Sequence, residues 1–438
     1  MTSEELARSI VARLRASGHQ AYLVGGCVRD LLLGRTPKDF DVATEARPDR
    51  ITELFERSEQ VGAHFGVVLV RENTAQVEVA TFRSDASYSD GRRPDAVCFE
   101  ASPRQDVMRR DFTINALLLD PDTNEVLDFA GGRADLSRRL IRAIGDADAR
   151  FREDHLRLIR AVRFAARLGF EIEPQTLAAL QRLHRLILRV APERIRDELV
   201  RILTEGGARR GFELLDATGL LGDLLPEVAA MKGVAQPPEF HPEGDVWTHT
   251  LLLLERLRSP TPTLAMGALL HDVGKPPAFR VADRIRFDGH VEEGVRLARG
   301  ILGRLRFSNE QAEMIEALIA NHMRFKDTGK MRESTLKRFL RMENFAEHLE
   351  LHRLDCLASN GRLETYKRVC ARLAEMGEEE LRPKLLLSGR DLIEAGYQPG
   401  PQFATMLAAL EDAQLEGRVK NRDEALALVR AQFGPATE

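Results

Sequence analysis

The sequence predicts an α+β protein, with a small mixed sheet of about five strands in an N-terminal head and predominantly helical domains behind it. Two observations predict this class. Apolar runs suited to strands, some of them rich in β-branched residues, are concentrated in the first ~130 residues. From about Phe151 onward, apolar residues recur every three or four positions between Leu, Ala, Arg and Glu, which is the pattern of amphipathic helices.

The elements of the head are expected in a fixed order along the chain. In that order they are a helix over 4–17, a strand over 21–26, a helix from 28, and strands over 40–44, 65–70, 77–82 and 117–119. Between residues 84 and 107 lies a polar segment without periodicity. A connection of more than about 15 residues without its own structure is usually a mobile functional loop or a linker.

The length of 438 residues predicts two to four domains, because single hydrophobic cores stop growing near about 250–300 residues. A glycine-rich turn, a loop with three prolines and an Arg-Pro pair mark the boundaries, at 130–132, 232–242 and 382–383. We therefore expect a head over 1–145, a helical neck over 146–230, a further helical domain over 231–380 and a helical tail over 381–438.

Composition excludes several classes of protein. No apolar stretch approaches the ~18–20 residues of a membrane helix, and the N-terminus does not resemble a secretory signal, so we expect a cytoplasmic protein without membrane contact. Four cysteines without a CxxC pair argue against a disulfide framework and against a cysteine-type zinc site. The net charge of −4 means that nucleic-acid binding requires a local patch, and residues 133–167 carry ten arginines against five acids.

A first candidate site lies in the head. Gly25 and Gly26 join a strand to a helix, where the backbone can approach a phosphate, although such a pair is also ordinary turn geometry. Asp39 and Asp41 are alternate residues of an expected strand and therefore point to one face. Converging carboxylates favour Mg²⁺, as in two-metal phosphoryl transfer, and Glu78 is the candidate third acid.

Four motifs occur in one order: GGCVRD at 25–30, KDFD at 38–41, RRDFTINAL at 109–117 and EDHLRLIRAVRFAARLGF at 153–170. Their order and spacing resemble the class II tRNA nucleotidyltransferases, which are the CCA-adding enzymes and their bacterial poly(A) polymerase relatives. The resemblance implies a five-stranded catalytic sheet followed by helical neck, body and tail domains, with nucleotide and RNA bound by the neck and with the tRNA 3′ end, CTP and ATP as partners. It also implies that nucleotide is bound by the following residues: Gly25, Gly26, Arg29, Arg110, Asp111, Asn115, Asp154, Arg157, Arg160 and Arg163.

The fourth motif offers a basis for choosing bases without a template. Glu153, Asp154, Arg157, Arg160 and Arg163 are expected along one helix, where neighbours three apart can touch one ligand. A carboxylate accepts hydrogen bonds and a guanidinium donates them. An Asp154/Arg157 pair therefore suits cytosine and adenine, which present an amino donor beside a ring-nitrogen acceptor, and rejects uracil and guanine. The alternative is an ordinary surface ion pair between the two.

A second candidate site lies between residues 240 and 355. Six potential metal ligands occur there on otherwise apolar helices: His249, His271, Asp272, His290, His322 and Asp355. The HDxGK segment at 271–275 and the flanking ligands resemble the HD phosphohydrolases. We expect a divalent metal of undetermined identity on His249, His271, Asp272 and Asp355, with His290 and His322 on a second ion or a phosphate. His241 and His352 are expected at the surface.

Several functions remain open at this level. Some tRNA nucleotidyltransferases carry an HD domain with phosphodiesterase or phosphatase activity toward 2′,3′-cyclic and 2′ phosphates, which implies an end-repair activity.

A poly(A) polymerase shares every head motif, although residues 406–438 are not a basic tail of the kind that binds RNA nonspecifically. Addition of the terminal A alone is also open, whereas the polar loop at 88–94 disfavours CC-only addition. From another class, the chain could be an HD hydrolase with an inactive head, which the intact Asp39 and Asp41 disfavour. The oligomeric state stays open.

Overall fold

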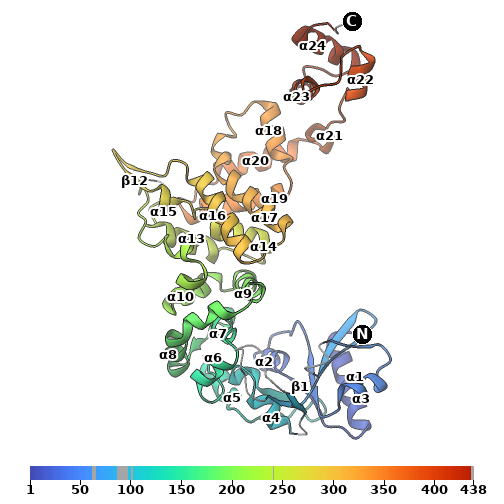
Figure 1. Ribbon diagram of the computed structural model, residues 1–438, viewed down its shortest axis with the longest axis vertical. Coiled ribbons are helices and arrows are strands. Elements are labelled where there is room, and N and C mark those ends of the chain that lie inside the picture. The colour runs from blue at the N-terminus through green and yellow to red at the C-terminus, as the bar shows by residue number, and fades with distance from the viewer. Residues whose placement is uncertain (62–65, 86–96, 100–101, 240, 436–438) are drawn as a thin grey trace. The chain divides into compact units, whose positions relative to one another are not determined.

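The computed structural model describes residues 1–61, 66–85, 97–99, 102–239 and 241–435, and it divides into two compact units (Figure 1). The first unit consists of Met1–Ala230, Leu257–Pro262 and Ile301–Phe307. The second consists of Met231–Arg256, Thr263–Gly300 and Ser308–Glu438. The loop predicted at 88–94 lies outside the described residues.

A mixed sheet forms the core of the head, in the order β3-β4-β5-β2-β1-β8-β9. The strands are β1 (Ala21–Val24), β2 (Asp41–Thr44), β3 (Ser58–Gln60), β4 (Val67–Glu72), β5 (Ala75–Thr81), β8 (Leu117–Leu119) and β9 (Val126–Asp128). The five central strands are the five apolar runs of the sequence. The two additional strands, β3 and β9, are three-residue edge strands without a buried residue, so hydrophobicity did not reveal them.

Helices cover the sheet where the sequence has amphipathic segments. Helix α1 (Ser3–Ala16) begins at a capping box, in which Thr2 and Glu5 each accept the other's backbone N–H, and its buried face packs on β1 and β5. Helix α3 (Pro48–Leu54) lies beside α1 (Figure 1). Helix α2 (Gly26–Leu32) starts two residues before the expected position. At the described ends of the polar segment 84–107, β6 (Arg83–Asp85) pairs with β7 (Val97–Phe99).

The rest of the first unit, as far as it is described, is helical, with one further pair of short strands, β10 and β11. Its elements are α4 (Pro103–Met108), the 3-10 turn η2 (Thr113–Asn115), α5 (Gly132–Arg138), β10 (Leu140–Ile141), α6 (Ala147–Glu153), α7 (Arg157–Leu168), β11 (Glu171–Ile172), α8 (Pro174–Leu183), η3 (His184–Arg189), α9 (Pro192–Thr204), α10 (Ala208–Ala217), α11 (Leu220–Leu224) and α12 (Pro226–Ala229). Helix α7 is buried against α9 and α10. The single helix expected through the fourth motif is wrong, because α6 ends at Glu153 and α7 begins at Arg157.

The second unit is an assembly of helices with one short hairpin. Its elements are α13 (Val246–Glu255), α14 (Pro262–Leu270), α15 (Lys275–Ala278), β12 (Arg280–Val281), β13 (Ile285–Arg286), α16 (His290–Arg304), α17 (Asn309–Asn321), η4 (His322–Asp327), α18 (Glu333–Leu340), α19 (Phe345–Ala358), α20 (Glu364–Glu375), α21 (Glu378–Leu381), α22 (Gly389–Glu394), α23 (Gln402–Leu415) and α24 (Arg422–Phe433). The last three helices share a core of their own around Leu392, Leu410 and Val429. Among the described residues, no helix is long and apolar enough to cross a membrane.

Candidate functional sites

A strongly charged cavity of about 510 Å³ opens in the first unit, between the head sheet and the helices of the neck. Ten lysine or arginine side chains and six carboxylates line it. Twelve of the residues selected from the sequence lie on its wall: Gly25, Gly26, Arg29, Asp39, Asp41, Arg110, Asp111, Asn115, Asp154, Arg157, Arg160 and Arg163. Residues from all four motifs therefore meet in one place, and the cationic excess suits a polyanionic ligand.

Two carboxylates line one edge of this cavity, and a third lies opposite one of them on the neighbouring strand. Asp41 opens β2 and lies opposite Glu78 of β5 in the parallel register, while Asp39 precedes the strand in a bend. Burial, together with the charges of Glu78 and Asp39, raises the pKa of Asp41 to about 6 against the opposing charge of Arg110. Mutual repulsion of this kind is relieved by a bound cation. Glu78 is exposed and does not line the cavity itself.

The loop at Gly25 is shaped for a close approach of the backbone. Gly25 has φ +77°, and a Cβ there would lie 3.2 Å from Arg110 Nη1. Arg110 is held in turn by Asp106, whose Oδ2 is 3.0 Å from its Nη2, and the other oxygen of Asp106 binds Arg109 at 2.7 Å. Asp106 is almost fully buried. Asp106 was not predicted to belong to the site, because a carboxylate in a polar segment carries no signal of burial.

Asp111 and Asn115 hold arginines in place. Arg29 donates from Nη1 to Asn115 Oδ1 at 2.6 Å, and Asn115 donates to Asp111 Oδ1 at 3.0 Å. Arg160 donates from Nε to the other oxygen of Asp111 at 2.9 Å. Burial disfavours the Asp111 carboxylate, but the charge of Arg160 outweighs it and lowers the pKa of Asp111 to about 2. The network fixes two guanidinium groups at the cavity wall.

Arg163 is the most deeply placed of the α7 arginines. Its Nε lies 2.8 Å from Glu198 Oε2 of α9, and its guanidinium carbon lies 4.4 Å from the centre of the Phe164 ring. Burial lowers its pKa to about 10 despite the charge of Glu198. Arg160 shares the same ring at 5.3 Å. Glu198, also unrecognised in the sequence, therefore neutralises part of the charge behind the cavity wall.

Asp154 and Arg157 both line the cavity but form no ion pair with each other in the described structure. Asp154 Oδ2 lies 3.4 Å from Arg194 Nη2, and its Oδ1 accepts the backbone N–H of Leu156 at 3.1 Å. Arg157 is bound by Glu153 at 2.8 Å and donates to the Arg109 carbonyl at 2.9 Å. The surface ion pair considered as the alternative is therefore absent from the described structure, and the two side chains are held separately.

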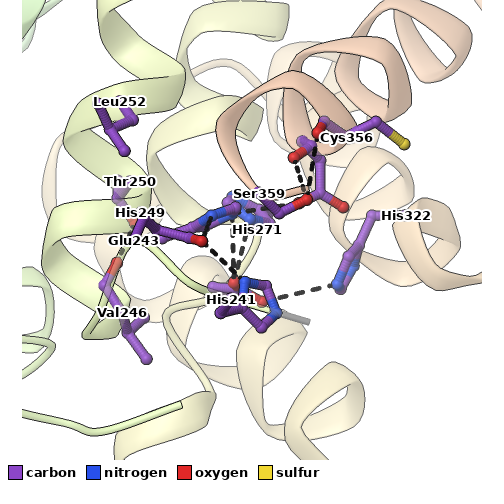
Figure 2. Close-up of polar contacts among 12 residues, drawn as sticks. His241, Glu243, Val246, His249, Thr250, Leu252, His271, His322, Cys356 and Ser359 are labelled. Carbon is purple, nitrogen blue, oxygen red and sulfur yellow. Dashed lines mark hydrogen bonds and ion pairs between the residues drawn. The ribbon is translucent and has the colours of Figure 1, made fainter. Parts of the chain in front are cut away.

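The second site contains all six ligands predicted in the second unit. They form two groups, His249 with His271 and Asp355, and Asp272 with His290 and His322, each with its ligand atoms within 4.8 Å of one another. His249 Nε2 is 3.1 Å from Asp355 Oδ1, and His271 Nε2 is 3.1 Å from Asp272 Oδ2. Figure 2 shows His249 and His271 turned into one space, with His322 facing it. Two imidazoles and a carboxylate suit a transition-metal ion.

The imidazole tautomers can be inferred from their partners. His271, His290 and His322 each hydrogen-bond through Nδ1 to the carbonyl oxygen three residues earlier, at 2.7–2.9 Å. The Nε2 atoms of these residues and of His249 are buried and have no hydrogen bond among the described residues. A neutral imidazole with an N–H at Nδ1 has its lone pair at Nε2. The Nε2 atoms of His271, His290 and His322 are thus suited to bind a metal, whereas His249 Nε2 faces the Asp355 carboxylate and must lose any proton shared with it when a metal binds.

Lys275 and Glu243 are two other charged side chains in contact with these ligands. Lys275 Nζ lies 2.7 Å from Asp272 Oδ2 and 2.7 Å from Gln236 Oε1. Burial disfavours the Asp272 carboxylate, but the neighbouring His271 and Lys275 hold its pKa well below the usual range. Burial also opposes the charge on His249, yet Asp355 and Glu243 raise its pKa to about 9. Lys275 belongs to the HDxGK segment, although no role was predicted for it.

The prediction that His241 and His352 are surface residues is wrong. His241 is half-buried, lines the cavity at this site, and shares Glu243 with His249. His352 is buried, with its ring stacked on Phe325 at 4.4 Å. Phe325 is distant from His352 in the sequence. Glu243 is near His241, but it lies in a loop, so periodicity could not identify either contact.

Three family models match the chain. The poly A polymerase head domain matches residues 21–142, the probable RNA and SrmB-binding site of polymerase A matches 169–232, and the HD domain matches 245–359. The nucleotidyltransferase and HD families are metal-dependent, and the two groups of candidate ligands described above agree with this.

Curated relatives and solved structures agree with these models. The chain is 33% identical to the CCA-adding enzyme of Levilactobacillus brevis over 425 residues, which is 96% of both chains, and 31% identical to that of Enterococcus faecalis over 427 residues, covering 96% and 94%. The Bacillus stearothermophilus CCA-adding enzyme in complex with CTP has 28% identity and a TM-score of 0.77, covering 99% of this chain and 98% of that one. The Thermotoga maritima CCA-adding enzyme complexed with tRNA_CCA shares the fold, at a TM-score of 0.58, 19% identity, and coverage of 98% and 95%. The chain belongs to the CCA-adding enzyme family of tRNA nucleotidyltransferases.

Proposed function

We propose that this chain adds CCA, from CTP and ATP, to the 3′ end of tRNA. The head cavity carries the proposal, because carboxylates suited to metal, a glycine loop and ten cationic side chains meet there. Such a set suits a nucleoside triphosphate and an RNA end better than a neutral small molecule. Relatives named CCA-adding enzyme, aligned over 96% of both chains, support the same activity.

We assign Mg²⁺ to the head, held by Asp39 and Asp41 with Glu78 as the third acid. The converging carboxylates and the raised pKa of Asp41 support this assignment, since oxygen ligands suit a hard cation. When bound, such ions activate the attacking 3′-hydroxyl and stabilise the departing pyrophosphate. The protein's part is to hold these carboxylates at the mouth of a cationic cavity, where a triphosphate can meet them.

The remaining wall residues would bind and orient the nucleotide. Gly25 and Gly26 allow the backbone to approach the phosphates. Arg29, Arg110, Arg160 and Arg163 supply donors and positive charge for the triphosphate. Asp111 holds Arg160 and Asn115 holds Arg29, so neither guanidinium can turn away from the cavity. Asp111 and Asn115 also line the cavity themselves, where they could contact a ribose.

Asp154 and Arg157 are our candidates for base choice. Both line the cavity, and each is anchored by other residues rather than by its partner. A fixed acceptor and a fixed donor on the wall of one cavity are complementary to the edges of cytosine and adenine. A uracil or guanine edge would leave buried polar groups unpaired, at a cost of about 1–3 kcal/mol each.

An incorporation assay on three RNAs tests the proposal against its closest alternatives. Labelled CTP, ATP or both are supplied with tRNA lacking its CCA end, tRNA ending in CC, and an unrelated RNA. We expect two C and one A on the first substrate, one A on the second and no extension of the third. Extension of the second substrate alone would identify an A-adding enzyme, and long A tracts on all three would identify a poly(A) polymerase.

A second candidate function belongs to the metal-ligand cluster of the second unit. We propose that it hydrolyses phosphate esters at RNA ends, with 2′,3′-cyclic and 2′ phosphates as substrates and a divalent metal as cofactor. Four buried Nε2 atoms without hydrogen bonds in the described structure, next to two carboxylates, support a hydrolytic metal centre. His290 and His322 are proposed for a second ion or for the phosphate. Release of phosphate or opening of a cyclic phosphate, dependent on an added metal, is the corresponding assay.

A further inference from the structure

The ligand His249 is held differently from the other imidazoles of the second site. His271, His290 and His322 hydrogen-bond through Nδ1 to main-chain carbonyls of Ala268, Phe287 and Ile319. His249 Nδ1 instead meets the side chain of Glu243, whose Oε1 is 2.7 Å away. A carboxylate partner orients an imidazole and raises its basicity as a ligand more than a neutral carbonyl does.

Glu243 is itself firmly placed. Its side chain is 7% exposed, and the same Oε1 atom is 2.9 Å from His241 Nδ1. The loop that carries it is closed by Asp245, whose side chain accepts N–H groups from Gly233 at 2.6 Å and from Thr248 at 2.7 Å. Asp245 is also the N-cap of α13, the helix that carries His249. Asp245 therefore joins the loop that carries Glu243 to the helix that carries His249.

We propose that Glu243 is a positioning residue of the metal centre. It fixes the ring of His249 so that Nε2 points at Asp355 and Asp272, and it holds His241 at the wall of the same cavity. The inference rests on the metal-dependent second function proposed above. It assigns the effect to metal affinity, which can be measured without any substrate. His241, Glu243 and His249 also have ligand atoms within 4.8 Å of one another, but Glu243 Oε1 already contacts Nδ1 of both rings, so we assign His241 to Glu243 and not to the ion.

The test uses metal-free full-length protein in an Asp41→Ala background, which removes a proposed metal ligand from the head. Mn²⁺ and Zn²⁺ are titrated calorimetrically into the parent and into Glu243→Gln, Glu243→Ala, His241→Phe and Glu239→Gln. Glu239 is the matched control, because it is an exposed carboxylate that lines the same cavity. The melting temperature of each metal-free variant shows whether the fold is intact.

We expect Glu243→Ala to weaken metal binding by about 10–100-fold, as for other partners of metal-ligating histidines, and Glu243→Gln to weaken it less. Gln keeps an oxygen acceptor for Nδ1 but loses the negative charge. Glu239→Gln and His241→Phe should stay within about threefold of the parent, a change of less than 1 kcal/mol. The metal-free melting temperature of Glu243→Gln should match that of the parent.

Three results would overturn the proposal: unchanged metal affinity in both Glu243 variants, an equal loss in His241→Phe, or no divalent-metal binding by the parent. A parent that binds metal but hydrolyses no phosphate ester, with a loss confined to the Glu243 variants, would leave the positioning role in place. That result would instead reject the proposed substrates of the second function.

Discussion

At the scale of single residues, the head cavity depends on charges that are each balanced by a specific neighbour. Asp41 is different, since burial and the like charges of Glu78 and Asp39 outweigh its attraction to Arg110 and raise its pKa. A residue in this position is stabilised by a cation and contributes little to folding without one. Loss of Asp41 should therefore lower the catalytic rate more than it lowers the stability of the fold.

Asp39→Ala and Asp41→Ala should each lower CTP and ATP incorporation by more than about 100-fold, because each removes a metal ligand. Binding of tRNA, measured by filter retention, should change little, because the cationic wall is intact. Asp122→Ala is the control, an exposed carboxylate outside the cavity. Substantial incorporation by both variants would exclude these acids from catalysis.

Base choice is the second property that single residues decide. Asp154→Asn combined with Arg157→Ala should raise UTP and GTP incorporation relative to CTP and ATP. Asn can donate as well as accept, and the loss of the guanidinium removes a donor that uracil N3–H and guanine N1–H cannot tolerate. The ratio of kcat/KM values should shift by about 1–3 kcal/mol, or roughly 5- to 150-fold, while overall activity falls.

Arg152→Ala provides the control for that measurement, since Arg152 is exposed on α6 and lies outside the cavity. The four nucleotides are compared on tRNA lacking its CCA end. Discrimination equal to that of wild type in the double variant would move base choice to other residues of the head or neck, with Arg194 next in line because it is the ion partner of Asp154.

At the scale of helices and strands, periodicity predicted the elements but not the contacts between them. The five central strands and α1 follow from apolar patterns, because burial of one face is what selects those residues. The break between α6 and α7 does not follow from apolar patterns. Asp154 uses its own carboxylate to bind a backbone N–H two residues on, a local contact that competes with the helix and leaves hydrophobic spacing unchanged.

The site was predictable where its residues are consecutive or regularly spaced, as in the head motifs and the HDxGK segment. Asp106, Glu198 and Glu243 were not recognised. Each is a buried carboxylate whose partner is brought near by a turn or by another helix, and a lone acidic residue in a sequence is most often exposed. Only the folded chain distinguishes these three from the rest.

Close packing of two elements produces a prediction at this scale. A Cβ on Gly274, just before α15, would lie 2.1 Å from the His290 carbonyl and 2.5 Å from the Gly294 nitrogen of α16. Gly274→Ala must therefore push α16 away, at a cost of about 1–3 kcal/mol, and His290 moves with that helix. We expect a lower melting temperature and weaker metal binding, measured by thermal unfolding and calorimetry.

Gly300→Ala is the matched control in the same helix, because a Cβ there would meet nothing within 4 Å. Replacing a glycine inside a helix should raise stability by about 0.5–1 kcal/mol. If Gly274→Ala were as stable as wild type, the close contact between α15 and α16 would not be a constraint on the metal centre.

At the scale of the whole molecule, charge is distributed by site and not by net balance. The chain carries a net charge of −4, yet the head cavity has four more cationic than anionic side chains. A local excess of this kind attracts an RNA end without making the whole surface adhesive to nucleic acid. The two polar centres also lie in different compact units, so each can be altered with the other left intact.

The separation predicts two independent losses of function. His271→Ala and Asp272→Asn should lower metal-dependent hydrolysis of 2′,3′-cyclic or 2′ phosphates by more than about 100-fold, because each removes a proposed ligand. Asn is chosen at position 272 because it keeps the volume and one oxygen facing Lys275, whose buried charge would otherwise keep only Gln236 as a partner. The same proteins should add CTP and ATP to tRNA at wild-type rates. Asp41→Ala should show the reverse pattern, with hydrolysis retained and addition lost.

Both activities are measured on one preparation of each variant, with a melting curve to confirm folding. A parallel loss of both activities in a folded His271→Ala protein would contradict the independence of the two centres, whereas a wild type that hydrolyses neither ester with any divalent metal would mean that the second centre acts on another class of substrate.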